Sequence, residues 1–128
     1  MAVNKTKSTF EILEVWKEAR ILRKEISNVV KQFPSVEQFR LSDQMIRASR
    51  SVAANIAEGH GRYHYQENIQ FCRQARGSIY ELLDHLTVAL DENFITEDMF
   101  NDLKEKILKV IKMLNGYISY LKRRKENE

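Results

Sequence analysis

The amino-acid sequence predicts an all-α protein built as an up-down-up-down antiparallel four-helix bundle. Three observations support this fold class. Apolar residues recur at alternating spacings of three and four in several long segments, as expected of helices that each bury one face. The 128 residues contain only one proline and four glycines, so few positions favour a helix break. The connections between the periodic segments are short, and short connections make sequential helices antiparallel.

Composition divides the chain into three parts. Residues 1–7 carry Lys5 and Lys7 and no apolar period, so we expect a flexible N-terminal arm. Residues 8–123 hold the periodic segments of the predicted bundle, and residues 124–128 form a charged C-terminal tail. A chain of this length buries roughly two-thirds of the surface that it exposes when unfolded, so one domain is expected to fold without disulfides.

The first predicted helix begins at Ser8, because Ser8 and Glu11 have the spacing of a capping box. It ends near Gln32, since Pro34 cannot continue a helix and favours an extended conformation at Phe33. Its predicted buried face contains Ile12, Val15, Ala19, Leu22, Ile26, Val29 and Phe33.

The second helix is predicted from a cap at Ser42 to Glu58, with Gly59 as a left-handed stop. Its predicted buried stripe is Leu41, Met45, Ala48, Val52, Asn55 and Ile56. Asn55 is the one large polar residue on this stripe, so we expect its amide to point inward. Two interpretations stay open for this amide, a structural role that fixes the helix register and a contact with a ligand.

The third helix is predicted over residues 64–91. Gly77, in its middle, is expected to permit close contact with a neighbouring helix near Arg47. The predicted buried face is Cys72, Ala75, Ile79, Leu82, Leu86 and Ala89.

The fourth helix is predicted to begin at a Thr96 cap and to end in the basic run 122–125. Glu97 and Asp98 lie in its first turn, where the positive end of the helix dipole stabilises acidic side chains. Its predicted buried face is Phe100, Leu103, Ile107, Val110, Leu114, Tyr117 and Leu121.

Further apolar residues lie outside these main faces and predict a closed homo-oligomer, because a lone bundle would leave them in water. They are Leu13, Trp16, Ile21 and Val30 in the first helix and Leu108, Ile111, Met113, Ile118 and Tyr120 in the fourth.

Charge is segregated along the chain, whose formal net charge is +3 and whose pI is near 9.0. Antiparallel helices bring the basic residues to one end and the acidic residues Glu37, Asp43, Asp91, Glu92, Glu97, Asp98 and Asp102 to the other. Two interpretations remain open, simple complementation of the helix dipoles and a phosphate-binding end. Tyr63, His64 and Tyr65 lie beside Arg62, where rings can stack on unpaired bases or pack as caps. The candidate nucleic-acid-binding residues are Lys5, Lys7, Arg47, Arg50, Arg62, His64, Arg73, Lys122, Arg123, Arg124 and Lys125.

Two sequence motifs resemble a known family. They are S-V-A-A-N-I-A-E-G at residues 51–59, followed by Arg62, and A-R-G-S-I-Y-E-L at residues 75–82; the match extends upstream to F-x-x-L-x-V-W-x-x-A at residues 10–19. Both resemble the bacterial four-helix bundle family that is encoded in intervening sequences of 23S ribosomal RNA genes. The motif residues to which we assign a structural role are Asn55, Glu58, Gly59, Gly77 and Ser78.

This resemblance implies further properties. The family is similar in fold to the accessory variability determinant (Avd) of diversity-generating retroelements, and members of both groups are ring-like homopentamers linked to nucleic acid. The resemblance therefore implies a homopentamer, RNA or DNA as a partner, and a partner protein such as a reverse transcriptase if the chain is retroelement-like. The chain has Ile46 and Arg47 where family members often carry two adjacent arginines.

The sequence argues against catalysis and metal binding. His60, His64 and Cys72 do not have the spacing of a zinc site, and no nucleophile has a base and an orienting group. We therefore expect no enzyme activity, no cofactor and no metal. One cysteine gives no disulfide framework, and no apolar run reaches the length of a membrane span, so we expect a cytoplasmic protein without a membrane partner. Two functions remain, an oligomeric nucleic-acid-binding protein and a protein-interaction scaffold.

Overall fold

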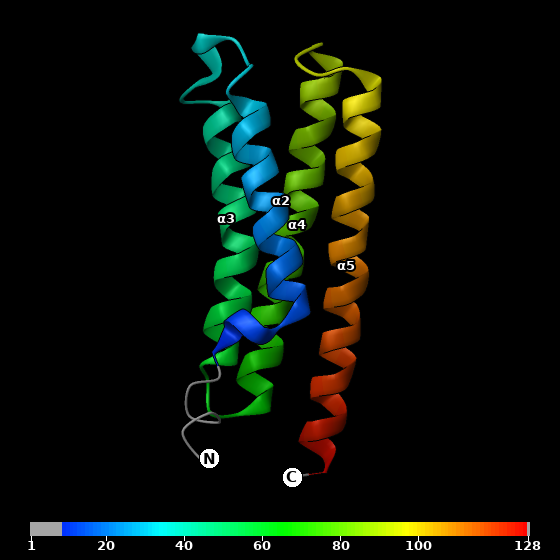
Figure 1. Ribbon diagram of the computed structural model, residues 1–128. Helices are drawn as coiled ribbons and strands as arrows, with labels where there is room; N and C mark the ends of the chain where they lie inside the picture. The colour runs from blue at the N-terminus through cyan, green and yellow to red at the C-terminus, as the bar shows by residue number, and fades with distance from the viewer. Residues whose placement is uncertain (1–8, 128) are drawn as a thin grey trace.

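The computed structural model describes residues 9–127 and confirms the all-α four-helix bundle. Figure 1 shows that the four long helices alternate in direction and that the described chain, residues 9–127, starts and finishes at the same end of the bundle. The long helices are α2 (Glu14–Val30), α3 (Leu41–His60), α4 (Tyr65–Asp91) and α5 (Glu97–Glu126), and two short 3-10 helices are η1 (Phe10–Ile12) and η2 (Ser35–Glu37). The predicted arm at 1–7, with Lys5 and Lys7, and the predicted cap Ser8 lie outside the described residues.

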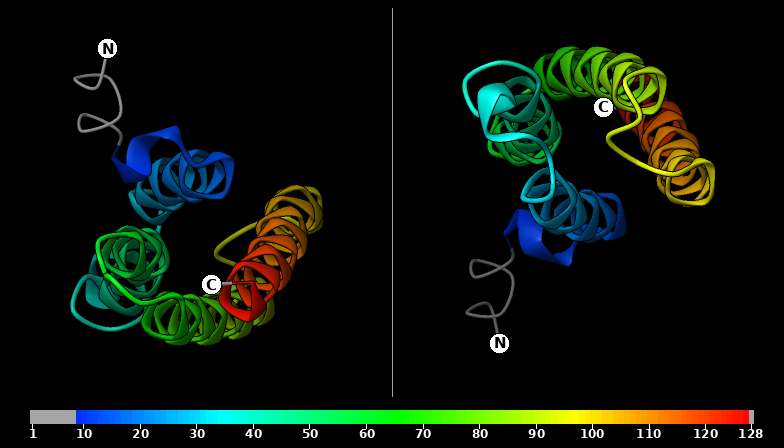
Figure 2. Two further views of the ribbon diagram at one scale, coloured as in Figure 1. Left: turned by 90° about the horizontal axis from the view of Figure 1, so that it is seen from below. Right: turned by 90° about the horizontal axis from the view of Figure 1, so that it is seen from above.

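The helices follow one another around the bundle in the order α2, α3, α4 and α5 (Figure 2). Two cross-helix ion pairs join α5 back to α2: Lys106 Nζ lies 2.8 Å from Glu25 Oε1, and Lys109 Nζ lies 3.0 Å from Glu18 Oε1. Because α2 has 17 residues whereas α4 has 27 and α5 has 30, α5 projects beyond the start of α2 at the end of the bundle that holds the α3–α4 turn. α5 continues to Glu126 and so includes the first part of the predicted tail at 124–128.

The predicted buried faces form the core. Every residue of the predicted α4 face is buried, as are the central residues of the faces of α2 and α5. Val29, Phe100 and Tyr117 are half-buried, and Ile12 was placed wrongly, because it belongs to η1 and is 58% exposed. Of the apolar residues outside the main faces, Trp16, Val30, Ile111 and Ile118 are buried within the single chain, whereas Ile21, Leu108 and Tyr120 are exposed.

The start of the first helix differs from the prediction. Thr9 caps η1, accepting the N–H of Glu11 at 3.4 Å, and Leu13 then adopts an extended conformation before α2 begins at Glu14. α2 ends at Val30, and the N–H groups of Gln32 and Phe33 bond to the carbonyls of Val29 and Val30 in a closing turn. The ring of Phe33 packs against Phe94, with centroids 5.4 Å apart, and so joins the two connections at this end.

Both predicted ends of the second helix are wrong. α3 begins at Leu41, whose N–H donates to Glu37 Oε1 at 3.3 Å, while Ser42 lies inside the helix and is buried. Gly59 is not a left-handed stop, because α3 continues to His60 and no glycine in residues 9–127 has a positive φ. Gly61 follows as the cap, and its N–H bonds to the carbonyls of Ala57 and Glu58 at 3.2 Å.

Two further expectations are corrected in the middle of the bundle. Gly77 does not face a neighbouring helix at close range, because an added Cβ would meet no atom within 4 Å. Asn55 is half-buried rather than inside the core, although the other five residues of its stripe are buried. Its amide nitrogen donates to Ser51 O at 2.9 Å and Ser51 Oγ at 3.0 Å, and Ser51 Oγ lies 2.8 Å from Ser78 Oγ.

The ends of the last two helices follow the prediction. α4 begins at Tyr65, directly after His64, and ends at Asp91. Thr96 caps α5, because its hydroxyl oxygen accepts the N–H of Met99 at 3.1 Å.

Candidate functional site

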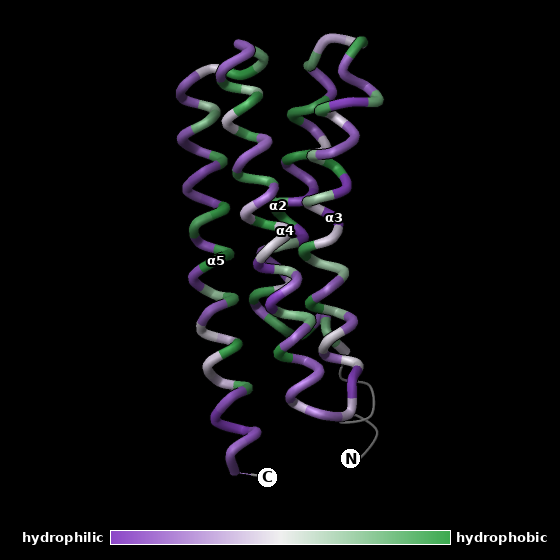
Figure 3. Tube along the Cα trace, turned by 180° about the vertical axis from the view of Figure 1, so that it is seen from behind, coloured by the Kyte–Doolittle hydropathy of each residue, from purple (hydrophilic) through white to green (hydrophobic). Residues whose placement is uncertain are grey.

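The basic end of the bundle is defined here as the α3–α4 turn, the first turns of α4 and the last turns of α5. These segments lie together at one end of the bundle (Figure 1), and the last turns of α5 are hydrophilic (Figure 3). The helix directions put the predicted acidic residues at the opposite end, around the α2–α3 and α4–α5 connections. The predicted separation of charge along the sequence is therefore a separation between the two ends of the molecule.

Side-chain bonds hold the end of α5 beside the start of α4. The Arg124 guanidinium donates from Nε and Nη2 to the Tyr65 hydroxyl, at 3.3 and 3.2 Å, and lies 5.8 Å from the centre of that ring. One residue further on, Lys125 Nζ donates to Gln66 Oε1 at 2.6 Å. Arg124 and Lys125 are thus positioned by their partners rather than extended freely into solvent.

A hollow of about 330 Å³ lies where these two helix ends meet. We call it the cationic hollow, and its lining residues are Gln66, Ile69, Arg73, Lys122, Lys125 and Glu126. Within residues 9–127, the side chains of Arg73 and Lys122 have no ion-pair or hydrogen-bond partner. The partner of Lys125 is Gln66, which carries no charge. Three cations and one carboxylate, that of Glu126, leave the hollow with an excess of positive charge, which favours an anion such as phosphate.

Arg62 is less available for phosphate binding than the sequence implied. Its guanidinium lies 3.8 Å from both Glu58 Oε2 and Glu67 Oε2, and its centre lies 4.7 Å from the centre of the Phe71 ring. Glu58 and Glu67 are therefore ion-pair partners of Arg62. All three charged side chains are about half-exposed, so the pairs contribute little stability, but they offset the positive charge of the turn.

The other predicted site residues fall into two groups. Arg123 is exposed near the end of α5, and His64 is exposed directly before α4, so both belong to the basic end. Arg47 and Arg50 are exposed on the first half of α3, which starts at the acidic end. The structure therefore does not bring them together with the basic residues of α5.

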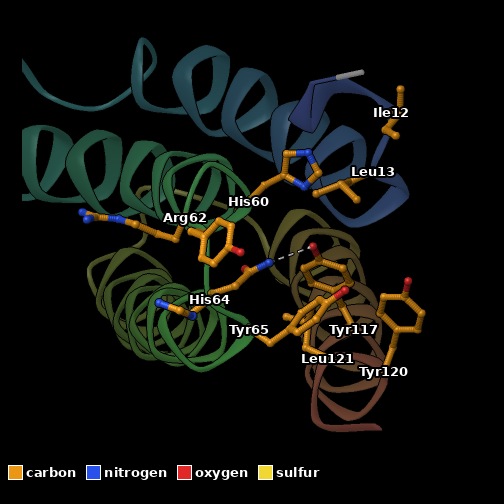
Figure 4. Close-up of a pocket in the computed structure, with 11 residues that line it drawn as sticks. Ile12, Leu13, His60, Arg62, His64, Tyr65, Tyr117, Tyr120 and Leu121 are labelled. Carbon is orange, nitrogen blue, oxygen red and sulfur yellow. Dashed lines mark hydrogen bonds between the residues drawn. The ribbon is translucent and has the colours of Figure 1, made fainter. Parts of the chain in front are cut away.

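The largest pocket described lies at the same end and has a volume of about 560 Å³. We call it the tyrosine pocket, because Tyr65, Tyr117 and Tyr120 line one wall with Leu121, while Leu13 and His60 line another (Figure 4). Arg62 and His64 also contribute to the lining, but Figure 4 shows their side chains extending away from the three tyrosines. Rings from α4 and α5 therefore form one side of the pocket.

Asn68 holds the inner wall of this pocket and is the buried amide of the bundle end. It is 7% exposed; its Nδ2 donates to the Tyr117 hydroxyl at 3.3 Å, and its Oδ1 accepts the Cys72 thiol at 3.5 Å. The sequence interpretation assigned this role to Asn55 and missed Asn68. The helical spacing of the sequence already indicated that Asn68 is buried, because Asn68 precedes Cys72 by four residues and extends the predicted face of α4 by one turn.

The ionisable groups beside Asn68 stay protonated at neutral pH. Burial raises the pKa of the Cys72 thiol to about 12. Burial also raises the pKa of Tyr117, and this effect exceeds the opposing effect of the Asn68 hydrogen bond. Cys72 is therefore not a reactive thiolate, and the site is neutral on its inner wall.

Within residues 9–127, no group of three or more His, Cys, Asp and Glu side chains has the arrangement of a metal site. In the same part of the chain, no helix is both long enough and apolar enough to cross a membrane.

The fold and the site define a class of four-helix bundle protein that carries a cationic hollow and an aromatic pocket at one end. The family model for 23S rRNA-intervening sequence proteins matches residues 11–116, and the chain belongs to this family. The crystal structure of a protein of unknown function from the S23 ribosomal protein family of Bacteroides thetaiotaomicron is similar, with a TM-score of 0.76 and 21% identity, and the match covers 82% of this chain and 95% of that chain. At that identity the similarity shows the fold alone. A comparison with curated proteins gives no match.

Proposed function

We propose that the protein is a non-enzymatic, oligomeric nucleic-acid-binding protein that contacts RNA or DNA through its basic end. The observation that carries the proposal is the cationic hollow, in which Arg73, Lys122 and Lys125 surround one depression. Phosphate groups satisfy such a set of cations without a requirement for base identity. We therefore expect binding without strong sequence preference.

The family description supports this proposal, because it links these proteins with 23S ribosomal RNA through the intervening sequences. A function connected with ribosomal RNA also agrees with a cytoplasmic location. The resemblance to retroelement accessory proteins adds a homopentamer to the proposal. Five copies of one weak patch around a symmetry axis act together through effective concentration, so a ring binds a long strand more tightly than a single subunit does.

The test is a titration of labelled single-stranded RNA and duplex DNA at several salt concentrations. The hollow variant replaces Arg73, Lys122 and Lys125 by alanine. The control variant likewise replaces Lys17, Arg20 and Lys24 on the outer face of α2, which line a different depression together with Ile21. Because Ile21 is exposed and is a candidate contact between subunits, light scattering first establishes that both variants keep the mass of the parent. Because both variants lose the same formal charge, any difference between them reports the position of the charge rather than its amount.

We expect the parent and the control variant to bind with similar affinity and a similar dependence on salt. The hollow variant should bind more weakly, and the slope of log affinity against log salt should fall by about one for each phosphate that an engaged subunit no longer binds. Equal loss of affinity in both variants would show that net charge alone drives binding. Absence of binding by the parent would refute the proposal.

A protein-interaction scaffold remains the second candidate, and one feature of the acidic end favours it. Val36 is 60% exposed and Phe39 is 85% exposed, both in the connection between α2 and α3. Exposed apolar side chains of this kind are typical of protein contacts. A partner protein that dissociates from Phe39→Ser, but stays bound to the parent at high salt, would support the scaffold.

A further inference from the structure

The tyrosine pocket is a second feature of the basic end, and its lining restricts the kind of ligand it accepts. None of its lining side chains, all within residues 9–127, is a carboxylate, although Asp and Glu account for 18 of the 128 residues. His60 contributes an imidazole to the lining, whereas the side chains of Arg62 and His64 extend away from the tyrosines. A volume of about 560 Å³ is in the range of sites that hold small organic ligands. The lining therefore suits a planar aromatic group, and it places no carboxylate against a negative charge that adjoins such a group.

The aromatic wall offers a surface for stacking. The rings of Tyr117 and Tyr120 are tilted by only 15° from each other, with centroids 6.2 Å apart. Tyr120 stays 46% exposed, so it presents ring surface that no residue of this chain covers within the described range. A third planar group can continue this stack, because offset parallel rings attract one another. Tyr63, which the sequence suggested for this purpose, is 92% exposed and its ring packs edge-on against His64.

Two tyrosine hydroxyls are also prepared to donate hydrogen bonds. The Tyr117 oxygen accepts from Asn68, and the Tyr65 oxygen accepts from Arg124, yet neither hydroxyl hydrogen has an acceptor among residues 9–127. Each hydroxyl can therefore donate to an acceptor atom of a ligand. Nucleobase edges carry such acceptors as carbonyl oxygens and ring nitrogens. The buried amide of Asn68 fixes the hydroxyl end of Tyr117 and so orients one of these donors in advance.

The pocket and the cationic hollow flank the same turn of α5. Leu121 lines the pocket, Lys122 and Lys125 line the hollow, and Arg124 bonds to the Tyr65 hydroxyl beside the pocket. One nucleic-acid strand that crosses this turn can place its phosphates near the cations and one base near the rings. Neither feature requires the strand to be paired.

We propose that the tyrosine pocket binds one unpaired nucleobase, stacked on Tyr120, from the strand whose phosphates lie at the cationic hollow. This inference rests on the proposed function and adds a preference to it, for single-stranded or looped nucleic acid over duplex. A base inside a duplex is stacked between its neighbours and must be extruded before it reaches the pocket. Extrusion costs free energy, and an unpaired base reaches the pocket without this cost.

The experiment uses the full chain and a short single-stranded RNA that contains 2-aminopurine, a base analogue whose fluorescence falls when it stacks on an aromatic ring. The same RNA annealed to its complement serves as the duplex probe. The test variant is Tyr120→Ala, and the matched control is Tyr80→Ala, because Tyr80 is 53% exposed on α4 and does not line the pocket. Circular dichroism establishes that both variants fold.

We expect the parent and Tyr80→Ala to quench the probe and to bind the single strand more tightly than the duplex. Tyr120→Ala should lose the quenching, and its affinity for the single strand should fall by roughly tenfold or more, while its affinity for the duplex stays the same. Salt-dependent binding without quenching, with equal affinity for both probes and no difference between the two variants, would overturn the inference and leave the proposed function standing. If the parent binds neither probe, both proposals fail together.

Discussion

Gly59 of α3 lies against Asn68 of α4 with no space for a side chain between them. A Cβ on Gly59 would be 2.7 Å from Asn68 Oδ1 and 2.9 Å from Phe71 Cβ, both closer than ordinary van der Waals contact. Asn68 in turn donates to Tyr117 of α5. One close approach therefore sets the packing of three helices at the end of the bundle that carries the candidate site.

Substitution of the helical glycines tests this relationship. We expect Gly59→Ala to destabilise the protein by about 1 to 3 kcal/mol, because the new methyl group forces Asn68 or the α3–α4 backbone to move. Gly77→Ala is the matched control and should stabilise the protein by up to about 1 kcal/mol, since it lies in α4 with open space around the added atom. Urea denaturation of the three proteins measures both effects. Equal effects of the two substitutions would contradict the close contact.

The two amides should differ in their contribution to stability. Asn68→Leu is expected to cost about 1 to 3 kcal/mol, because it removes the partner of the Tyr117 hydroxyl and of the Cys72 thiol in a buried place. Asn55→Leu should cost about 1 kcal/mol or less, because Asn55 is half-buried and bonds only to Ser51 on its own helix. Thermal melts of the two variants against the parent measure the difference. A larger loss for Asn55→Leu would reverse the assignment of the core amide.

Stability should fall in alkaline solution because of Cys72. The folded protein holds the thiol proton up to a pKa of about 12, whereas the unfolded chain releases it near 9.0. The folded state therefore binds more protons between these values, and the stabilisation present below pH 9 is lost as the pH rises towards 12, by about 1.4 kcal/mol per unit. The raised pKa of Tyr117 acts in the same direction above its ordinary value of 10.0.

The measurement is the free energy of unfolding from pH 8 to 11 in the parent and in Cys72→Ala. We expect the variant to be less stable at pH 8 but to lose less stability as the pH rises. Parallel curves for the two proteins would show that Cys72 does not titrate differently on folding.

Assembly is a separate prediction, and it follows from the apolar side chains that the single chain leaves in water. Ile21 on α2 and Leu108 on α5 are each 48% exposed. For the proposed homopentamer, we expect light scattering at micromolar concentration to give a mass near 75 kDa, about five times the 15.1 kDa of one chain. Ile21→Lys and Leu108→Lys should each shift the mass towards that of one chain. A parent mass near 15 kDa would refute the oligomer.

Much of this fold was predictable because helix formation and burial leave a periodic record in one segment at a time. The faces of α4 and α5 show this, since Cys72 to Ala89 and Leu103 to Leu121 keep a helical spacing along their whole length. The Thr96 cap was predictable for the same reason, because it depends on residues within one turn. The Ser42 cap was predicted wrongly because Glu37, from the preceding connection, bonds to the free N–H of Leu41.

The sequence by itself determined the four helices, their buried faces and the separation of basic from acidic residues. The tertiary structure alone decided how these faces meet. In the packed bundle, Gly59 is a point of close contact between helices and not a helix stop, and Asn68 is buried where Asn55 was expected to be. Tyr65 and Tyr117, from different helices, line one pocket. The physical reason is that periodicity fixes which side of a helix is buried, whereas the contacts between helices depend on their axial offset and rotation, which are set only when all four helices pack together.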